Sequence, residues 1–460
     1  MNKLAVLLAS IVIAFLSSCD SPGSNVLFSG KNINRWDTTG DVSVKENLLS
    51  LSQNSQAILK SGGYKDFDLT MELRTKPGGK GFIGFHTDSQ GKGYRVAVNN
   101  DLNDDAWWRM TGSLVSVRNL TKSFVRENEW FKMNIRVEGQ QVTVLINGEP
   151  VVEYIEPEKP LRKTPNDKAL ISEGTFSLVS TGTGDIEFKN ISVEVLDSKA
   201  INIPAQLAVA RNEQTDEIIR LHQDDFPVLD YHVHLKGGLT KEEAARQSRR
   251  LGINYVLAPN CGIGFSLTND NQVYDYLSTM RSEPFILAMQ AEGREWITTF
   301  SQKARDEFDF VFTDALTFTD KKGRRTRLWI PRETWIENEQ EYMDLIVDKI
   351  CDVLKEPVDI YVNPCFLPEP MDQRYDEFWT EERMNKFVAA LAESGKALEI
   401  NELYQIPNKA IIMKAKEAGV KFTFGSNNVT PDVSRLEYSL RMKKECGLTQ
   451  MDMYKPKIKI

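Results

Sequence analysis

The chain has 460 residues, a formal net charge of −8, 41% hydrophobic residues and 27% charged residues. This composition is ordinary for a globular protein, and the length allows two or three domains. The acidic balance disfavours a nucleic-acid partner, because phosphate binding needs a basic surface.

Residues 1–18 have the pattern of a secretory signal peptide. Lys3 precedes an apolar run from Leu4 to Leu16, which is shorter than a membrane-spanning helix requires. The ending "LSSC" resembles a bacterial lipobox, which implies cleavage before Cys19 and a lipid on that cysteine. We therefore expect residues 19–24 to tether a soluble body to the cell envelope, with membrane contact through lipid only. The alternative is an ordinary signal with an incidental cysteine.

Residues 25–197 alternate apolar and polar residues with a period of two, as half-buried strands do. The stretch "DFDLTMELRT" at 66–75 places apolar side chains on one face and polar ones on the other. Gly139 and the pair Asn147–Gly148 mark two tight turns. Short strands joined by regular turns predict an all-β sandwich of the jelly-roll type.

Five stretches of this segment resemble the 3-keto-disaccharide hydrolase-like family. They are "LFSGKNINRW" (27–36), "GYRVAVNN" (93–100), "TGSLVSVRNL" (111–120), "EWFKMNIRVEG" (129–139) and "VLINGEPVVEY" (144–154). The resemblance implies a concanavalin/laminin-G-like jelly roll. It also implies hydrolysis or lyase-type cleavage of glycosides oxidised at sugar carbon 3. A 3-keto group acidifies the C2 proton, so that a base and a polarising cation can eliminate the aglycone.

Polar and aromatic side chains of the same segment form a candidate sugar site. Aromatic rings stack on the C–H faces of sugars, and polar groups bind the hydroxyls. The candidate catalytic residues are His86 and Arg95. The candidate substrate-binding residues are Asn99, Trp107, Trp108, Arg109 and Arg118. In the alternative interpretation, His86 and one of the two tryptophans belong to the core.

Residues 198–225 form a linker that changes from a loop to a short amphipathic helix, in which we expect His222 to lie at the surface. From 226 to 460, apolar strands alternate with amphipathic helices. The strand candidates are 227–233, 253–259, 284–291, 308–314, 358–364, 397–401 and 421–426. Apolar strands of this kind are typical of a parallel sheet buried on both faces. The segment therefore predicts a (β/α)7 barrel with its chemistry at the carboxyl ends of the strands.

Polar residues follow the ends of these strands, beginning with "DYHVH" at 230–234. That opening, together with "EGREW" (292–296), "LEIN" (398–401) and "AGVKFTFGSNN" (418–428), resembles the polymerase-and-histidinol-phosphatase (PHP) family of metal-dependent phosphoesterases. The resemblance implies that His232 and His234 are the first two metal ligands and that Glu292 is the bridging carboxylate. Asn427 and Val429 stand where the family has its closing Asp and final His.

The remaining donors allow one divalent ion. The chain has only four histidines, so a polynuclear centre would lack nitrogen ligands. A shell of His232, His234, Glu292 and either Asp314 or Asn427 suits Zn²⁺ or Mn²⁺. Asp314 is also a candidate catalytic base. A metal-free remnant of the family's site is the alternative.

These predictions together indicate a lipid-anchored hydrolase of carbohydrate breakdown. Its jelly roll would act on 3-keto-glycosides, and its barrel would hold a single-metal hydrolytic site. Two alternatives stay open: a metal-dependent phosphoesterase with a sugar-binding jelly roll, and a non-enzymatic glycan-binding lipoprotein with a degenerate barrel. The cysteines of the second half lack the spacing of a disulfide framework, so we expect free thiols at Cys261, Cys351, Cys365 and Cys446.

Overall fold

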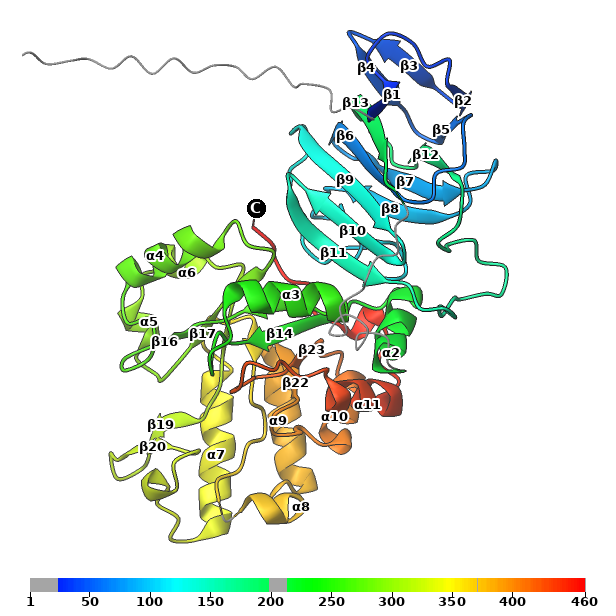
Figure 1. Ribbon diagram of the computed structural model, residues 1–460. Helices are drawn as coiled ribbons and strands as arrows, with labels where there is room; N and C mark the ends of the chain where they lie inside the picture. The colour runs from blue at the N-terminus through cyan, green and yellow to red at the C-terminus, as the bar shows by residue number, and fades with distance from the viewer. Residues whose placement is uncertain (1–23, 198–212, 370, 460) are drawn as a thin grey trace, which may run out of the picture.

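The computed structural model describes residues 24–197, 213–369 and 371–459. An antiparallel β-sandwich is followed by a parallel barrel surrounded by helices (Figure 1), which confirms the predicted fold class. The predicted signal peptide, Cys19, almost all of the tether and the first part of the predicted linker lie outside the described residues. None of the helices within these ranges combines the length and the apolar character that a membrane span requires.

The sandwich consists of two antiparallel sheets. The larger sheet contains, in spatial order, β11 (Glu149–Ile155), β10 (Gln141–Ile146), β9 (Phe131–Glu138), β6 (Phe67–Thr75), β13 (Ile186–Val195), β4 (Leu48–Leu51) and β3 (Val42–Lys45), with β1 (Ser24–Phe28) paired to β13. The second sheet contains β2 (Trp36–Thr39), β5 (Ser55–Leu59), β12 (Thr175–Ser180), β7 (Lys80–Thr87) and β8 (Tyr94–Asn99).

The period-two pattern forms these strands because it gives each strand one apolar face. Along β6, buried and half-buried residues alternate without a break from Phe67 to Thr75. The predicted turn between β10 and β11 is also present. Asn147 and Gly148 have φ angles of 54° and 92°, in the left-handed region that tight hairpin turns require. The pattern and the turn together fix which face of each strand points into the core.

The second domain is a closed barrel. In the part of the chain that the structure describes, seven parallel strands form the ring: β14 (Leu229–Val233), β15 (Asn254–Leu257), β17 (Ile286–Ala291), β18 (Phe310–Thr313), β21 (Ile360–Tyr361), β22 (Ala397–Asn401) and β23 (Phe422–Gly425), which pairs with β14 again. The short strand β16 (Asn260–Cys261) extends the pairing of β17, and β19 (Thr317–Thr319) forms a hairpin with β20 (Arg325–Arg327).

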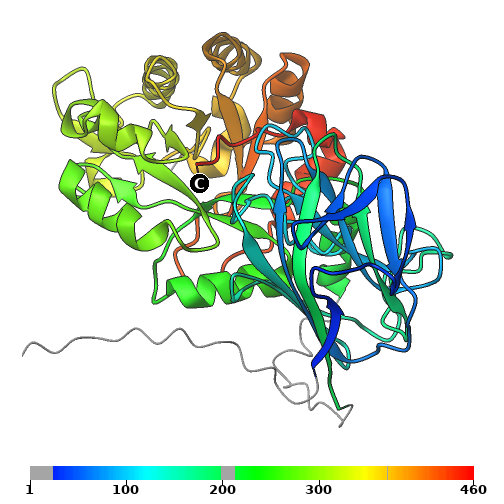
Figure 2. The same cartoon turned by 90° about the horizontal axis from the view of Figure 1, so that it is seen from above.

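Helices surround this ring, as the view from above shows (Figure 2). They are α2 (Glu213–Gln223), α3 (Lys241–Leu251), α4 (Asp270–Met280), α5 (Trp296–Thr299), α6 (Gln302–Asp306), α7 (Glu339–Val353), α8 (Tyr375–Phe378), α9 (Glu381–Ser394), α10 (Lys409–Glu417) and α11 (Glu437–Cys446), with short 3₁₀ turns η2 (Pro331–Glu333), η3 (Asp372–Arg374) and η4 (Gln450–Asp452). The Thr240 side chain caps α3, and Gly252 ends it with a φ of 75°. All four cysteines of the barrel are free thiols, as predicted.

The sandwich closes the end of the barrel at which the strands begin, which we call its lower end. Trp107 is only 5% exposed and packs among inward-facing barrel residues such as Tyr231, Ile286 and Phe310. Trp108 packs against the same cluster. The burial of Trp107 agrees with the alternative interpretation, in which one of the two tryptophans belongs to the core, whereas Trp108 is only half-buried.

Buried cations fasten this junction. The Arg118 guanidinium donates to the carbonyls of Val117 and Arg250, at 2.9 and 3.0 Å, and lies over the ring of Tyr154. The Lys122 ammonium donates to two backbone carbonyls next to the start of β17, at 3.0 and 2.7 Å. Arg118 lies at the end of α3 and is not available to a sugar, which corrects its predicted role. Arg109, another predicted sugar-binding residue, forms an ion pair with Asp225.

His222 belongs to the same junction, although the sequence predicted a surface position. Its side chain is fully buried, its Nε2 lies 2.8 Å from the Gly252 carbonyl, and its Nδ1 accepts the backbone N–H of Asn119 at 3.4 Å. Burial lowers the pKa of His222 to about 3, so the ring is neutral. The residues next to His222 in the sequence are polar and therefore indicated a surface position, but the sandwich contacts α2 at this histidine.

Candidate functional site

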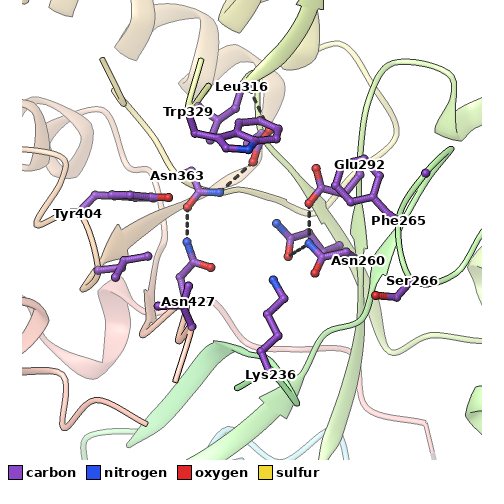
Figure 3. Close-up of a pocket in the computed structure, with 15 residues that line it drawn as sticks. Lys236, Asn260, Phe265, Ser266, Glu292, Leu316, Trp329, Asn363, Tyr404 and Asn427 are labelled. Carbon is purple, nitrogen blue, oxygen red and sulfur yellow. Dashed lines mark hydrogen bonds between the residues drawn. The ribbon is translucent and has the colours of Figure 1, made fainter. Parts of the chain in front are cut away.

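A cavity of about 570 Å³ opens at the upper end of the barrel, where the strands end. We call it the mouth cavity, and Figure 3 shows the side chains that point into it. Its lining residues are Lys236, Asn260, Gly264, Phe265, Ser266, Gln290, Glu292, Asp314, Leu316, Trp329, Asn363, Leu403, Tyr404, Asn427 and Val429. The predicted meeting of polar strand ends is therefore present, because parallel strands bring their carboxyl ends to one edge.

Two buried carboxyl groups face the mouth cavity from neighbouring strands. Glu292 follows β17, and Asp314 follows β18. Burial, and then the nearby charge of Asp314, raises the pKa of Glu292 to about 8. Burial also raises the pKa of Asp314, against hydrogen bonds from Asn363 and the Leu316 backbone N–H. At neutral pH the cavity therefore favours the protonated form of Glu292.

Side-chain amides hold these carboxyl groups in place. Asn260 Nδ2 donates to Glu292 Oε1 at 2.6 Å, and Asn363 Nδ2 donates to Asp314 Oδ2 at 2.8 Å. Asn427 Nδ2 donates to Asn363 Oδ1 at 2.9 Å. Asn363 and Asn427 have φ angles of 47° and 49°, a left-handed conformation that asparagine tolerates better than most residues. These turns direct their amides into the cavity.

The two histidines of "DYHVH" are buried and do not line the mouth cavity. His232 Nδ1 donates to Glu399 Oε1 at 2.6 Å, and its Nε2 lies 3.2 Å from Gln290 Oε1. His234 Nδ1 donates to the carbonyl of Ala258 at 2.7 Å. Burial lowers the pKa of His234 well below its usual value, so its ring is neutral. Its Nε2 lacks a partner of good hydrogen-bond geometry among the described residues, although the Asn427 amide lies near it.

As they are placed, these donors do not assemble a metal centre. Both ring nitrogens of His232 already face oxygen atoms of the protein. Within the described ranges, no three His, Cys, Asp or Glu side chains lie close enough together to hold an ion. The single Zn²⁺ or Mn²⁺ expected from the sequence stays a prediction. Metal analysis of the purified chain tests it: about one equivalent that is lost in His232→Ala would support it.

The sandwich candidates do not form a second site of this kind. His86 is buried, its Nε2 lies 2.8 Å from the Lys65 carbonyl, and its Nδ1 accepts the N–H of Ser172. Asn99 donates to Asp104 at 2.6 Å and so fixes a loop. Arg95 is exposed and lies over the Phe82 ring on the second sheet. The structure thus assigns His86 and Asn99 local structural contacts, and it leaves Arg95 accessible.

Sequence reasoning missed several residues of the mouth cavity, among them Gln290, Trp329 and Tyr404. Gln290 precedes Glu292 by two positions, so the period of a strand could have placed both on the inner face. Trp329 and Tyr404 both come from loops: Trp329 follows β20, and Tyr404 follows β22. No local pattern predicts where a loop aromatic folds back, because that depends on contacts between distant segments.

These features define a two-domain protein in which a β-sandwich closes one end of a parallel barrel, and an acidic, amide-rich cavity opens at the other. Residues 23–194 match the family model of the 3-keto-alpha-glucoside-1,2-lyase-like domain. This match confirms the resemblance inferred for the sandwich from its sequence. The resemblance of the barrel to the PHP family stays a prediction.

The alignments with similar solved structures cover less than half of this chain. A candidate glycosyl hydrolase from Parabacteroides distasonis is 18% identical, with a TM-score of 0.34, and the alignment covers 38% of this chain and 95% of that one. The carbohydrate-binding module CBM66 from Bacillus subtilis is 17% identical, with a TM-score of 0.27 and coverage of 36% and 96%. A search of curated proteins found no match.

Proposed function

We propose that this protein is a carbohydrate-active enzyme that cleaves glycosides at the mouth of its barrel. The observation that carries the proposal is the pair Glu292 and Asp314, two buried carboxyl groups with raised pKa values in one cavity. Perturbed carboxyl pairs are typical of sites that transfer protons. The surrounding amides suit sugar hydroxyls. In this proposal the sandwich packs against the opposite end of the barrel. Its match to the 3-keto-alpha-glucoside-1,2-lyase-like domain suggests that the substrate is a 3-keto-glycoside.

The proposed reaction is elimination from a 3-keto-glycoside. One member of the carboxyl pair accepts the C2 proton, and the electron pair forms the C1–C2 double bond as the C1–O bond breaks. The other member gives its proton to the leaving oxygen, so the products are an unsaturated keto-sugar and the free alcohol. The pair ends with the same number of protons with which it began. Water then adds to the unsaturated sugar if the overall outcome is hydrolysis.

Lys236 supplies the positive charge that this reaction needs. Its ammonium points into the mouth cavity near Glu292 (Figure 3), and it stabilises the negative charge that develops on the 3-keto oxygen. We expect Lys236→Met to lower kcat on a 3-keto-glucoside by about 10²-fold, because it removes this charge with little change in volume. Steady-state kinetics check this, and Lys236→Arg should retain more activity. An unchanged kcat in Lys236→Met would remove Lys236 from the mechanism.

We expect the activity to fall as the pH rises through about 8. The free enzyme loses the proton of Glu292 in that range, because its pKa is about 8. The carboxyl pair then has no proton to give to the leaving oxygen. A profile of kcat/KM against pH measures this, and the residual activity of Glu292→Gln should lack the fall. A wild-type profile that stays flat to about pH 10 contradicts the proposed role of the pair.

The proposal is tested by incubating the purified chain with 3-keto-glucosides and with the parent glucosides. We expect release of the aglycone from the oxidised substrates only, because only they have an acidified C2 proton. Phosphate release from model esters would instead favour the phosphoesterase alternative. Binding of sugars without any cleavage would favour the glycan-binding alternative.

We also propose export and lipid attachment at Cys19, on the pattern of residues 1–19 alone. Mass spectrometry of the mature protein would show an acylated N-terminal cysteine, and Cys19→Ser would be released from membranes. A soluble wild-type protein without acyl groups would contradict this part of the proposal.

A further inference from the structure

A second cavity, of about 460 Å³, adjoins the mouth cavity. We call it the side cavity. Trp329 and Tyr404 line both cavities, so the two spaces share a wall made of these aromatic side chains. They are 37% and 38% exposed, although large aromatic side chains usually gain free energy by burial. Both side chains are therefore partly accessible to a ligand at this boundary.

The side cavity has a different chemical character from the mouth cavity. Its lining residues are Leu328, Trp329, Pro331, Phe366, Leu367, Glu369, Asp372, Tyr375, Tyr404 and Ile406. Only Glu369 and Asp372 are charged, and both are exposed. The mouth cavity, in contrast, combines amides, two carboxyl groups and an ammonium. A ligand that fills both spaces therefore has one end rich in hydroxyls and one apolar end with rings.

We infer that the substrate is a glycoside with an apolar, ring-bearing aglycone, whose sugar lies in the mouth cavity and whose aglycone lies in the side cavity between Trp329 and Tyr404. The identity of the sugar end rests on the function proposed above. The assignment of the side cavity rests on its lining and on the two aromatic residues, Trp329 and Tyr404, that it shares with the mouth cavity. Aromatic and aliphatic walls favour an apolar ring over a second sugar, which would need more polar partners.

The Tyr404 residue at the boundary is held by two contacts within the protein. The backbone N–H of Tyr404 donates to Asn401 Oδ1 at 3.0 Å, and its ring meets Phe366 edge-on with centroids 4.8 Å apart. In Figure 3, Asn363 lies on the side of Trp329 and Tyr404, away from Glu292. Since Asn363 donates to Asp314, this carboxyl group is held by a residue on the side of Trp329 and Tyr404, whereas Glu292 lies on the other side. The bond to be broken would then cross between the two carboxyl groups.

Binding measurements with two matched ligands test this inference without requiring turnover. Methyl and 4-nitrophenyl 3-keto-glucosides share a sugar and differ in the aglycone. We expect Glu292→Gln, which slows cleavage, to bind the 4-nitrophenyl compound about 10-fold or more tightly than the methyl compound in calorimetry. Adding Trp329→Ala should remove this preference, because it should weaken binding of the 4-nitrophenyl compound more than binding of the methyl compound.

Trp335→Ala is the matched control. Trp335 is a similarly exposed tryptophan of the same loop region, it lies under the Arg324 guanidinium, and it lines neither cavity. This variant should keep the preference. Equal binding of the two ligands, or a preference that survives Trp329→Ala, overturns the inference even if the wild type cleaves both compounds. A preference that depends on Trp329 in a protein that cleaves neither compound supports the side cavity and contradicts the proposed reaction. Binding of neither ligand overturns both.

Discussion

Glu292→Gln is expected to lower kcat/KM on 3-keto-glucosides by about 10²- to 10⁴-fold, the usual contribution of a positioned acid or base. The amide keeps the shape of the side chain and its contact with Asn260, but it cannot exchange a proton. Steady-state kinetics with an aryl 3-keto-glucoside measure the loss. Glu295→Gln, an exposed carboxylate nearby, is the control and should retain full activity. Full activity in Glu292→Gln would remove this residue from the reaction.

Unfolding measurements separate this chemical effect from misfolding. Because the folded pKa of Glu292 is raised from 4.5 to about 8, the folded chain keeps a proton that the unfolded chain releases between these values. This carboxyl therefore lowers the free energy of unfolding progressively as the pH rises through that window, and the loss is complete above about 8. Glu292→Gln lacks this loss, so at neutral pH the variant should be at least as stable as the wild type. A less stable variant would leave the kinetic loss open to a structural explanation.

Trp107→Ala is expected to lower the free energy of unfolding by about 3–5 kcal/mol, the usual cost of removing a large buried aromatic side chain. Trp107 fills the lower end of the barrel, so the cavity left behind would face the inward side chains of several strands. Denaturant titration measures the change. Trp335→Ala, on the exposed surface, should change stability by less than about 1 kcal/mol.

The response of the two domains to Trp107→Ala also tests the junction itself. Since Arg118, Lys122 and the His222–Asn119 pair connect the domains through buried hydrogen bonds, loss of Trp107 should destabilise the barrel although the residue belongs to the sandwich. Hydrogen exchange of the barrel strands would report this. Unchanged hydrogen-exchange protection of the barrel strands in the variant would mean that the stability of the barrel does not depend on Trp107.

The sequence predicted the fold class, and it predicted that polar residues meet where the barrel strands end, and the physical reason is the same in both cases. A period of two identifies a strand with one buried face, and runs of apolar residues identify strands buried on both faces. Once the strands of a parallel barrel are found, the residues after them must meet, as Glu292, Asp314, Asn363 and Asn427 do.

The positions of Arg118 and His222, and which of the two adjacent tryptophans is buried, could not be predicted in this way. Each of these residues has the polar or aromatic character of a binding residue, and only the position of the other domain shows that it is buried. The same limit applies to Trp329 and Tyr404, which reach the mouth cavity from loops. Local patterns describe what a side chain can do, whereas contacts between distant segments decide where it does it.

The separation of the two ends of the barrel has a consequence for how this protein can diversify. Substitutions in the loops that carry Trp329 and Tyr404 are remote from the contacts of Trp107, Arg118 and Lys122, so their energetic effects should be nearly independent. Lineages or laboratory libraries can therefore vary ligand choice at one end while the other end preserves assembly. We therefore expect new ligand specificities to arise by variation in the loops that carry Trp329 and Tyr404, while the residues of the domain junction stay constant.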